Sequence, residues 1–246
     1  MILFLTSSPT GPLDGSRRVD GLDEMNCFPE KLRKYWVENA RCLMITAFPD
    51  NDAANDEMQQ FFSGTFEKCG FPVAAFDLWD GRTTDYSEEI LKSYDVILLG
   101  GGHVPTQNAF FHKIGLREKM QDFSGVVIGI SAGSMNSADI VYAQPEECGE
   151  AVDPNYVKFI KGLGLTKTNI IPHYQMVKDN YLDGMRLYED ITHGDSMGQR
   201  FLVLPDGSYL FAENGREIIY GEAYVIADGK IEKICEGDQC CIWKER

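Results

Sequence analysis

The chain has 246 residues, 43% of them hydrophobic, and a formal net charge of −15. Nucleic acids and anionic membranes would repel so acidic a surface, so the charge disfavours both as partners. The length and composition suit one sizeable core, and we expect residues 1–246 to form a single domain.

Nothing in the sequence suggests a disulfide framework, a zinc site or a membrane span. The seven cysteines are odd in number and lack the paired spacing of zinc ligands. No apolar run reaches the roughly 18 residues of a spanning helix, and the first residues lack a basic leader. We therefore expect a cytoplasmic protein with reduced thiols.

Apolar runs and helical patterns alternate along the first 130 residues. Continuous apolar runs predict buried strands at 1–6, 41–48, 71–78, 95–102 and 125–130. Helical spacing and capping residues predict helices at 28–40, 51–70, 87–94 and 107–123. Continuous apolar strands separated by helices indicate a mostly parallel sheet sandwiched by helices.

The pattern changes after residue 200. Short strands there are separated by Asp206-Gly207, Asn214-Gly215 and Asp228-Gly229, which are typical of hairpin turns. We expect these strands to be antiparallel additions to the edge of the sheet. The predicted fold class is therefore α/β, with C-terminal antiparallel hairpin strands.

The sequence from Gly129 to Gly133, GISAG, fits the G-x-S-x-G pattern of a strand-to-helix nucleophile elbow. It follows a predicted buried strand, where a sharp turn would expose the Oγ of Ser131. The two glycines leave room for close packing of the turn. A helix beginning near Ala132 would offer free N–H groups to an oxyanion. A plain tight turn capped by a serine would fit the same pattern.

A serine nucleophile needs a base, and the chain has four histidines. His173 ends an apolar stretch, and His103 follows the glycines at the end of strand 95–102. Both are expected at the carboxyl edge of the sheet, where Ser131 also lies, and His173 ranks first. Position alone does not select the acid that orients the histidine. The candidates between serine and histidine are Asp139, Glu146, Glu147, Glu150 and Asp153.

Three stretches, DVILLGGGHVPTQ, GVVIGISAGSMNSA and IIPHYQ, together resemble the dipeptidase E and cyanophycinase family of serine peptidases. The resemblance covers most of the chain and includes LPDGSYLF at 204–211. It implies a fold like that of class I glutamine amidotransferases, with serine in place of cysteine. It also implies that Ser131 is the nucleophile and His173 its base.

The resemblance implies further roles. In that family an acidic residue follows the serine by about a dozen and a half positions; Glu146 lies 15 residues after Ser131 and matches best, with Glu147 next. The oxyanion hole would be formed by the backbone N–H groups of Gly102 and Ala132. His103 stands where dipeptidase E has asparagine, which makes it a candidate substrate-site residue. Neither a metal nor an organic cofactor is implied.

These features predict a serine peptidase that hydrolyses small peptides, a dipeptidase E-like exopeptidase, through a Ser-His-Glu triad and an acyl-enzyme. The alternatives are a cyanophycinase-like hydrolase of an unusual peptide, a small-ester hydrolase, and a non-catalytic amidotransferase-like binding protein. We expect a monomer or homodimer whose partner is a small peptide. Members of the family cleave N-terminal aspartyl dipeptides. Arg186 is the candidate basic residue to bind the aspartate side chain, although it would also fit as an arginine on a helix surface.

Overall fold

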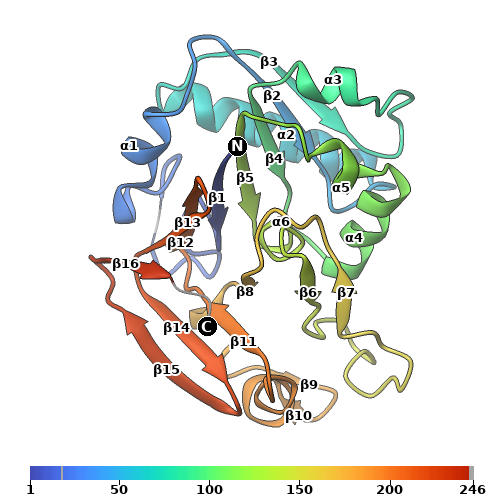
Figure 1. Cartoon of the computed structure of the whole chain (residues 1–246), viewed down its shortest axis with the longest axis vertical. Coiled ribbons are helices and arrows are strands. Elements are labelled where there is room, and N and C mark those ends of the chain that lie inside the picture. The colour runs from blue at the N-terminus through green and yellow to red at the C-terminus, as the bar shows by residue number, and fades with distance from the viewer. Residues whose placement is uncertain (18, 244–246) are drawn as a thin grey trace.

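An eight-stranded, mostly parallel sheet forms the centre of the computed structural model, which describes residues 1–17 and 19–243 (Figure 1). The strand order is β16-β13-β12-β1-β5-β4-β2-β3. The parallel strands are β1 (Ile2–Thr6), β2 (Ala40–Ile45), β3 (Val73–Trp79), β4 (Val96–Leu99) and β5 (Val126–Ile130). Each overlaps an apolar run that predicts a strand, and the expected α/β class is confirmed.

Helices cover both faces of this sheet. They are α1 (Phe28–Arg33), α2 (Asp52–Lys68), α3 (Glu88–Lys92), α4 (Val104–Lys113) and α5 (Leu116–Lys119). Successive strand residues point to opposite faces. Met44 of β2 accordingly shares a buried cluster with Phe66 of α2, whereas the next residue, Ile45, shares another with Phe111 of α4. Two apolar layers therefore hold the strands, and hence their carboxyl ends, in fixed positions.

The helix expected over residues 107–123 is in fact two helices, α4 and α5. Gly115 separates them in the left-handed conformation, with φ of 63°, which ends α4. Helix α4 begins at Val104, earlier than expected, because Pro105 is accommodated in its first turn. The helix expected over 28–40 is shorter than predicted and ends at Arg33.

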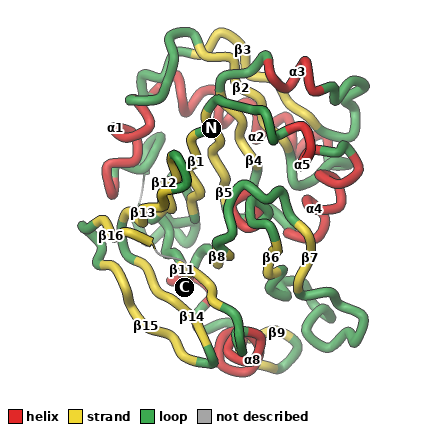
Figure 2. Tube along the Cα trace, in the orientation of Figure 1, coloured by secondary structure: helices red, strands yellow, loops and turns green. Residues whose placement is uncertain are grey.

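The C-terminal part contains the expected antiparallel strands, but they are divided between two sheets (Figure 2). Strands β12 (Tyr209–Glu213), β13 (Arg216–Tyr220) and β16 (Cys240–Trp243) extend the main sheet beyond β1. Strands β11 (Arg200–Val203), β14 (Ala223–Ala227) and β15 (Lys230–Cys235) are antiparallel neighbours in a second sheet, in which β8 (Asn169–Ile171) pairs parallel with β11. Only the first group adds to the main edge as predicted.

The three predicted hairpin turns behave differently. Asn214-Gly215 and Asp228-Gly229 join neighbouring antiparallel strands, and all four residues have positive φ, as such turns require. Asp206-Gly207 instead connects β11 of the second sheet to β12 of the main sheet. This crossing brings Asp206 to the carboxyl end of β1, where its side chain meets Ser7.

The remaining elements are short. They are the ribbon β6 (Ile140–Tyr142) and β7 (Phe159–Lys161), the hairpin β9 (Tyr181–Leu182) and β10 (Met185–Arg186), the helices α6 (Ala132–Met135), α7 (Tyr174–Val177) and α8 (His193–Asp195), a 3-10 turn at Met25–Cys27 and a π-helical turn at Leu187–Thr192. None of the helices in the described residues has the length and apolar character needed to cross a membrane. All seven cysteines are free.

Candidate active site

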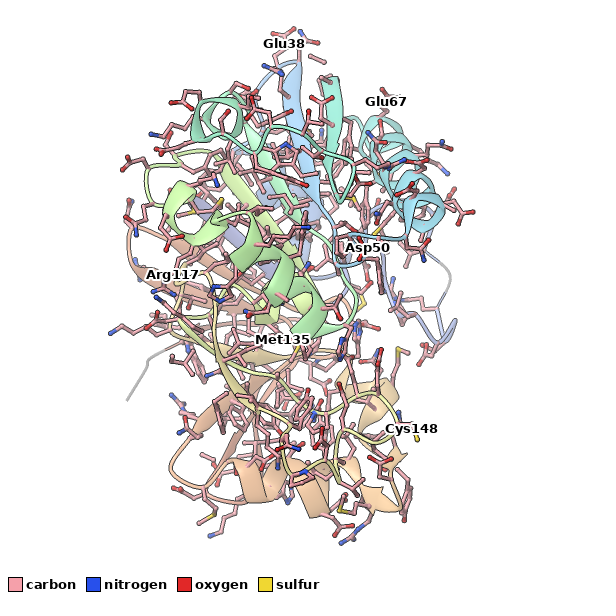
Figure 3. The ribbon with its side chains drawn as sticks, turned by 90° about the vertical axis from the view of Figure 1, so that its right-hand side faces the viewer. Glu38, Asp50, Glu67, Arg117, Met135 and Cys148 are labelled. Carbon is pink, nitrogen blue, oxygen red and sulfur yellow. The ribbon has the colours of Figure 1, made fainter. Side chains whose placement is uncertain are left out.

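Three neighbouring strands of the main sheet end together at its carboxyl edge. Thr6 of β1 pairs with Ile130 of β5, and Leu99 of β4 pairs with Gly129 of β5. The residues that follow these strands therefore lie at one edge, where parallel α/β sheets bind their ligands. Met135, at the end of α6, is labelled in Figure 3 at mid-height, between the helices of the main sheet above and the C-terminal strands below.

Ser131 occupies the turn between β5 and α6 in a strained backbone conformation, with φ of 50° and ψ of −111°. The glycines on either side allow this turn. A Cβ at Gly133 would lie 2.2 Å from the carbonyl oxygen of Leu99, and one at Gly129 would lie 2.8 Å from the Oγ of Ser134. The turn thus has the geometry of a nucleophile elbow, because no larger residue fits at either glycine position.

His173 follows β8 and places its ring directly against the elbow. Its Nε2 lies 2.9 Å from the Oγ of Ser131. The residue has a positive φ of 59°, and its backbone N–H donates to the Oγ of Ser7 over 2.8 Å. The second sheet therefore supplies the histidine, whereas the main sheet supplies the serine.

Asp206 lies on the other side of the imidazole. Its Oδ1 is 2.6 Å from the Nδ1 of His173, and its side chain is fully shielded from solvent. Burial alone would raise the pKa of the Asp206 carboxyl, but the hydrogen bonds from His173 and Ser7 lower it below its ordinary 3.8. An ionised carboxylate can only accept, so Nδ1 carries the proton and Nε2 is left to accept from the serine hydroxyl.

Each oxygen of the Asp206 carboxylate has more than one donor. Oδ1 also accepts from the Oγ of Ser7 over 2.7 Å. Oδ2 accepts from the Nε2 of Gln175 over 2.7 Å and from the backbone N–H of Leu13 over 3.2 Å. These four donors keep the charge stable in a buried position and fix the orientation of the carboxylate toward the histidine.

Glu146, the acid that the family resemblance implies, makes a different contact and is not hydrogen-bonded to His173. Its Oε1 accepts the backbone N–H of Val104 at the start of α4, over 3.1 Å. The expectation fails because the loop carrying Glu146 runs past the N-terminus of α4 rather than past the histidine. Glu147, the second choice, is exposed and makes its backbone contact to Glu150. Sequence spacing alone does not encode this path of the loop.

His103 belongs to a hydrogen-bond network beside the site. Its Nδ1 lies 2.7 Å from the Oγ1 of Thr106, and its Nε2 lies 2.8 Å from the Oε1 of Glu150. The candidate ligand atoms of His103, Glu147 and Glu150 lie within 4.8 Å of one another. The hydrogen bonds already account for this arrangement without an ion. His103 is not among the residues that line the cavity at Ser131.

A cavity of about 280 Å³ opens at Ser131 and His173. Its other lining residues are Gly102, Val104, Met135, Gln144, Pro145, Glu146, Pro172, Val177, Asn180, Tyr181, Leu182 and Leu187. The wall is largely apolar, with a few polar side chains, as small-molecule sites generally are. The volume is near the lower end of ligand sites, roughly 300–1,000 Å³, and matches a small substrate.

Both residues expected to form an oxyanion hole lie at this cavity or beside it. Gly102 lines the cavity and has a φ of 150°. Only glycine fits there, because a Cβ at this position would lie 2.6 Å from the ring of Phe48. Ala132 is the first residue of α6, where backbone N–H groups lack intrahelical partners. The two residues expected to supply the donors thus lie at the cavity wall and directly after Ser131.

One feature of the sequence indicates a site role for Asp206, but the local Asp-Gly pattern also fits a hairpin turn. The stretch 204–211 directly follows the buried strand Arg200–Val203, so Asp206 occupies a strand end like Ser131 and His173. Asp-Gly is also the usual hairpin dipeptide, and the same residues predict a turn. The functional position becomes evident only when β11 and β12 are assigned to different sheets.

Comparisons with known proteins agree with this geometry. The family model of peptidase family S51 matches residues 43–219. A peptidase from an acI-B1 Actinobacterium has a similar crystal structure, with a TM-score of 0.64 and 14% identity over 98% of this chain and 96% of that one. A peptidase E protein from Listeria monocytogenes EGD-e gives a TM-score of 0.56 and 15% identity over 89% and 96%. Comparison with curated proteins finds no match.

The α/β fold and the family match define a serine-type peptidase, a hydrolase. The chain belongs to peptidase family S51, since the matched region covers more than half of its length. The expected resemblance to the dipeptidase E family is thereby confirmed.

Proposed function

We propose that this peptidase hydrolyses small peptides, as a dipeptidase-like exopeptidase, through a triad of Ser131, His173 and Asp206. The observation that carries the proposal is the continuous chain of contacts from the Oγ of Ser131 through the imidazole to the buried carboxylate, over 2.9 Å and 2.6 Å. Asp206 takes the place that the family resemblance gives to Glu146. The cavity of about 280 Å³ suits one or two residues better than a long peptide.

Acylation begins with proton transfer from the Oγ of Ser131 to the Nε2 of His173 as the oxygen attacks the peptide carbonyl carbon. The carbonyl oxygen becomes an oxyanion, which the backbone N–H groups of Gly102 and Ala132 stabilise. Each such donor contributes about 3 kcal/mol to the transition state. His173 then gives its proton to the leaving amine, the C–N bond breaks, and an ester joins the acyl group to Ser131.

Deacylation repeats these steps with water as the nucleophile. His173 takes a proton from water, the hydroxide oxygen attacks the ester carbonyl, and the proton returns to the Oγ of Ser131 as the acid product leaves. Asp206 stays ionised throughout, because four donors hold its charge, and it stabilises the imidazolium formed in each half-reaction. Every step uses side chains and backbone groups of this chain.

Covalent labelling tests the nucleophile. A small fluorophosphonate probe should modify the wild type at Ser131, as read by peptide mass spectrometry, and Ser131→Ala should remain unmodified. Ser134→Ala is the matched control, because the Oγ of Ser134 is buried and donates to the carbonyl oxygen of Thr6. Equal labelling of the wild type and Ser131→Ala would show that another residue is the nucleophile.

A further inference from the structure

The cavity wall carries a negatively charged side chain, Glu146, and its described residues include no other carboxylate and neither a lysine nor an arginine. Arg186, the basic residue expected to read an acidic substrate, lies outside the wall and forms an ion pair with Asp190 over 2.6 Å. An acidic side chain entering this cavity would therefore meet like charge without a counter-charge.

Glu146 offers one carboxylate oxygen to a ligand. Its Oε1 is engaged by the N–H of Val104, whereas in the described residues its Oε2 has no hydrogen-bond partner. Glu146 is one of the residues that line the cavity, so a group bound there can reach its side chain. A carboxylate with a free oxygen at the wall of a small cavity is a suitable acceptor for an ammonium or guanidinium group.

The loop that carries Glu146 is held in place at several points. The Oε2 of Glu150 accepts the backbone N–H groups of Glu146 and Glu147, each over 2.9 Å. Further along, the carboxylate of Asp183 accepts the N–H groups of Gly149 and Ala151, over 2.8 and 3.0 Å. Asp183 lies in the turn of the hairpin whose first strand also lines the cavity, so loop and hairpin form one wall.

The surrounding residues do not fully compensate the charge of the Glu146 carboxylate. Partial enclosure by the wall raises the pKa of Glu146 above its ordinary 4.5, although the N–H of Val104 and the neighbouring His103 act in the opposite direction. A cationic group bound at Oε2 would supply the missing compensation. The ionised form would then be favoured when substrate is present.

We propose that Glu146 determines specificity by binding a cationic nitrogen of the peptide substrate, so that peptides bearing this group are preferred to peptides that lack it, and an acidic side chain in the cavity is disfavoured. The inference rests on the proposed peptidase function. The nitrogen has two sources, the α-ammonium group of the N-terminal residue or a lysine or arginine side chain. A side-chain cation would distinguish this chain from the N-terminal aspartyl preference that the family resemblance implies, whereas the α-ammonium group is present in aspartyl dipeptides as well.

Steady-state hydrolysis of matched dipeptides distinguishes these possibilities. The set contains lysyl, norleucyl and aspartyl peptides with the same second residue, each with a free and with an acetylated N-terminus. The proteins are the wild type, Glu146→Gln, which keeps an acceptor for Val104, and Glu147→Gln, which makes the same charge change at an exposed neighbour outside the cavity wall.

The measured quantity is the ratio of kcat/KM for a cationic peptide to that for its neutral counterpart. A hydrogen bond to a charged group, about 1.5–3 kcal/mol, corresponds to a ratio that falls roughly 10- to 100-fold in Glu146→Gln. Glu147→Gln should keep the wild-type ratio. If Glu146→Gln no longer lowers kcat/KM once the N-terminus is acetylated, the nitrogen is the α-ammonium group. If Glu146→Gln no longer lowers kcat/KM once lysine is replaced by norleucine, the nitrogen is that of the side chain.

Two outcomes overturn the inference alone: an unchanged ratio in Glu146→Gln, or faster cleavage of aspartyl than of lysyl and norleucyl peptides by the wild type. In both cases Ser131 is still labelled and peptides are still cleaved. The wild-type comparison decides the matter even if Glu146→Gln fails to fold. Absence of both labelling and hydrolysis in the wild type would overturn the proposed function and the inference with it.

Discussion

The carboxylate of Asp206 lies 2.6 Å from the Nδ1 of His173, and the same oxygen accepts the hydroxyl of Ser7 over 2.7 Å. Ser7 follows the first strand of the main sheet, His173 follows a strand of the second sheet, and Asp206 lies in the crossing between the sheets. The interface between the two sheets is thus held by the groups that orient the imidazole. Stability and activity should respond together when this contact is altered.

Ser7→Ala tests the support of the histidine. The change removes a donor to Asp206 and leaves the backbone N–H of His173, which now donates to Ser7 over 2.8 Å, without its acceptor. We expect kcat to fall about tenfold and stability to fall by about 1–3 kcal/mol, since a buried donor is left unsatisfied. Urea unfolding and peptide hydrolysis measure the two effects.

Ser8→Ala is the control for that substitution. Ser8 is also buried, but its hydroxyl donates to the carbonyl oxygen of Gly11 and does not contact the triad. It should lose stability while keeping kcat near the wild-type value. A loss of kcat in Ser8→Ala as large as in Ser7→Ala would argue that the site responds to general loosening and not to the Ser7 contacts.

Ionisation of Asp206 should make the free energy of unfolding depend on pH. Its pKa is lowered in the folded state, so the folded state binds fewer protons than the unfolded state in the range just below 3.8. The contribution of Asp206 is therefore present above pH 3.8 and is lost as pH falls through the folded pKa. The difference in unfolding free energy between wild type and Asp206→Asn, measured in urea from pH 3 to 7, should shrink at the acid end. A difference that grows on acidification would contradict the sign of this shift.

The elbow should tolerate no side chain at Gly133. An alanine Cβ would lie 2.2 Å from the carbonyl oxygen of Leu99, so β4 and α6 would have to move apart. Because overpacking costs about 1–3 kcal/mol, Gly133→Ala should lower both the melting temperature and the rate of Ser131 labelling. Gly64→Ala, within helix α2 and with open space around its Cβ, should instead raise stability by about 0.5–1 kcal/mol. Equal changes in melting temperature for Gly133→Ala and Gly64→Ala would contradict the steric explanation.

Local sequence patterns predict the main sheet well because its strands are buried on both faces and read as continuous apolar runs. The glycine pattern around Ser131 likewise reports a steric requirement, and the strand end before His173 places that residue at the correct edge. The division of the C-terminal strands between two sheets depends on long-range pairing, and no local pattern contains it. Asp206-Gly207 and Asn214-Gly215 look alike in sequence, yet only the second joins a hairpin.

The acid of the site also differs from the one that the family resemblance implies, which is Glu146 and not Asp206. The spacing of 15 residues after Ser131 measures distance along a loop and says nothing about the direction in which the loop leaves the elbow. In the structure that loop turns toward the N-terminus of α4, where Glu146 accepts from Val104. Glu146 therefore lies on the cavity wall, whereas Asp206, in the crossing between the two sheets, reaches the imidazole.

The central claim is that Asp206 orients His173 for proton transfer from Ser131. The direct measurement is the second-order rate constant for labelling of Ser131 by an uncharged fluorophosphonate in the wild type, Asp206→Asn, Glu146→Gln and Glu147→Gln. Asparagine would favour the wrong imidazole tautomer, and we expect a fall of about 10⁴-fold, with Glu147→Gln near the wild-type rate. A wild-type rate in Asp206→Asn, with a loss on that scale in Glu146→Gln, would contradict the account.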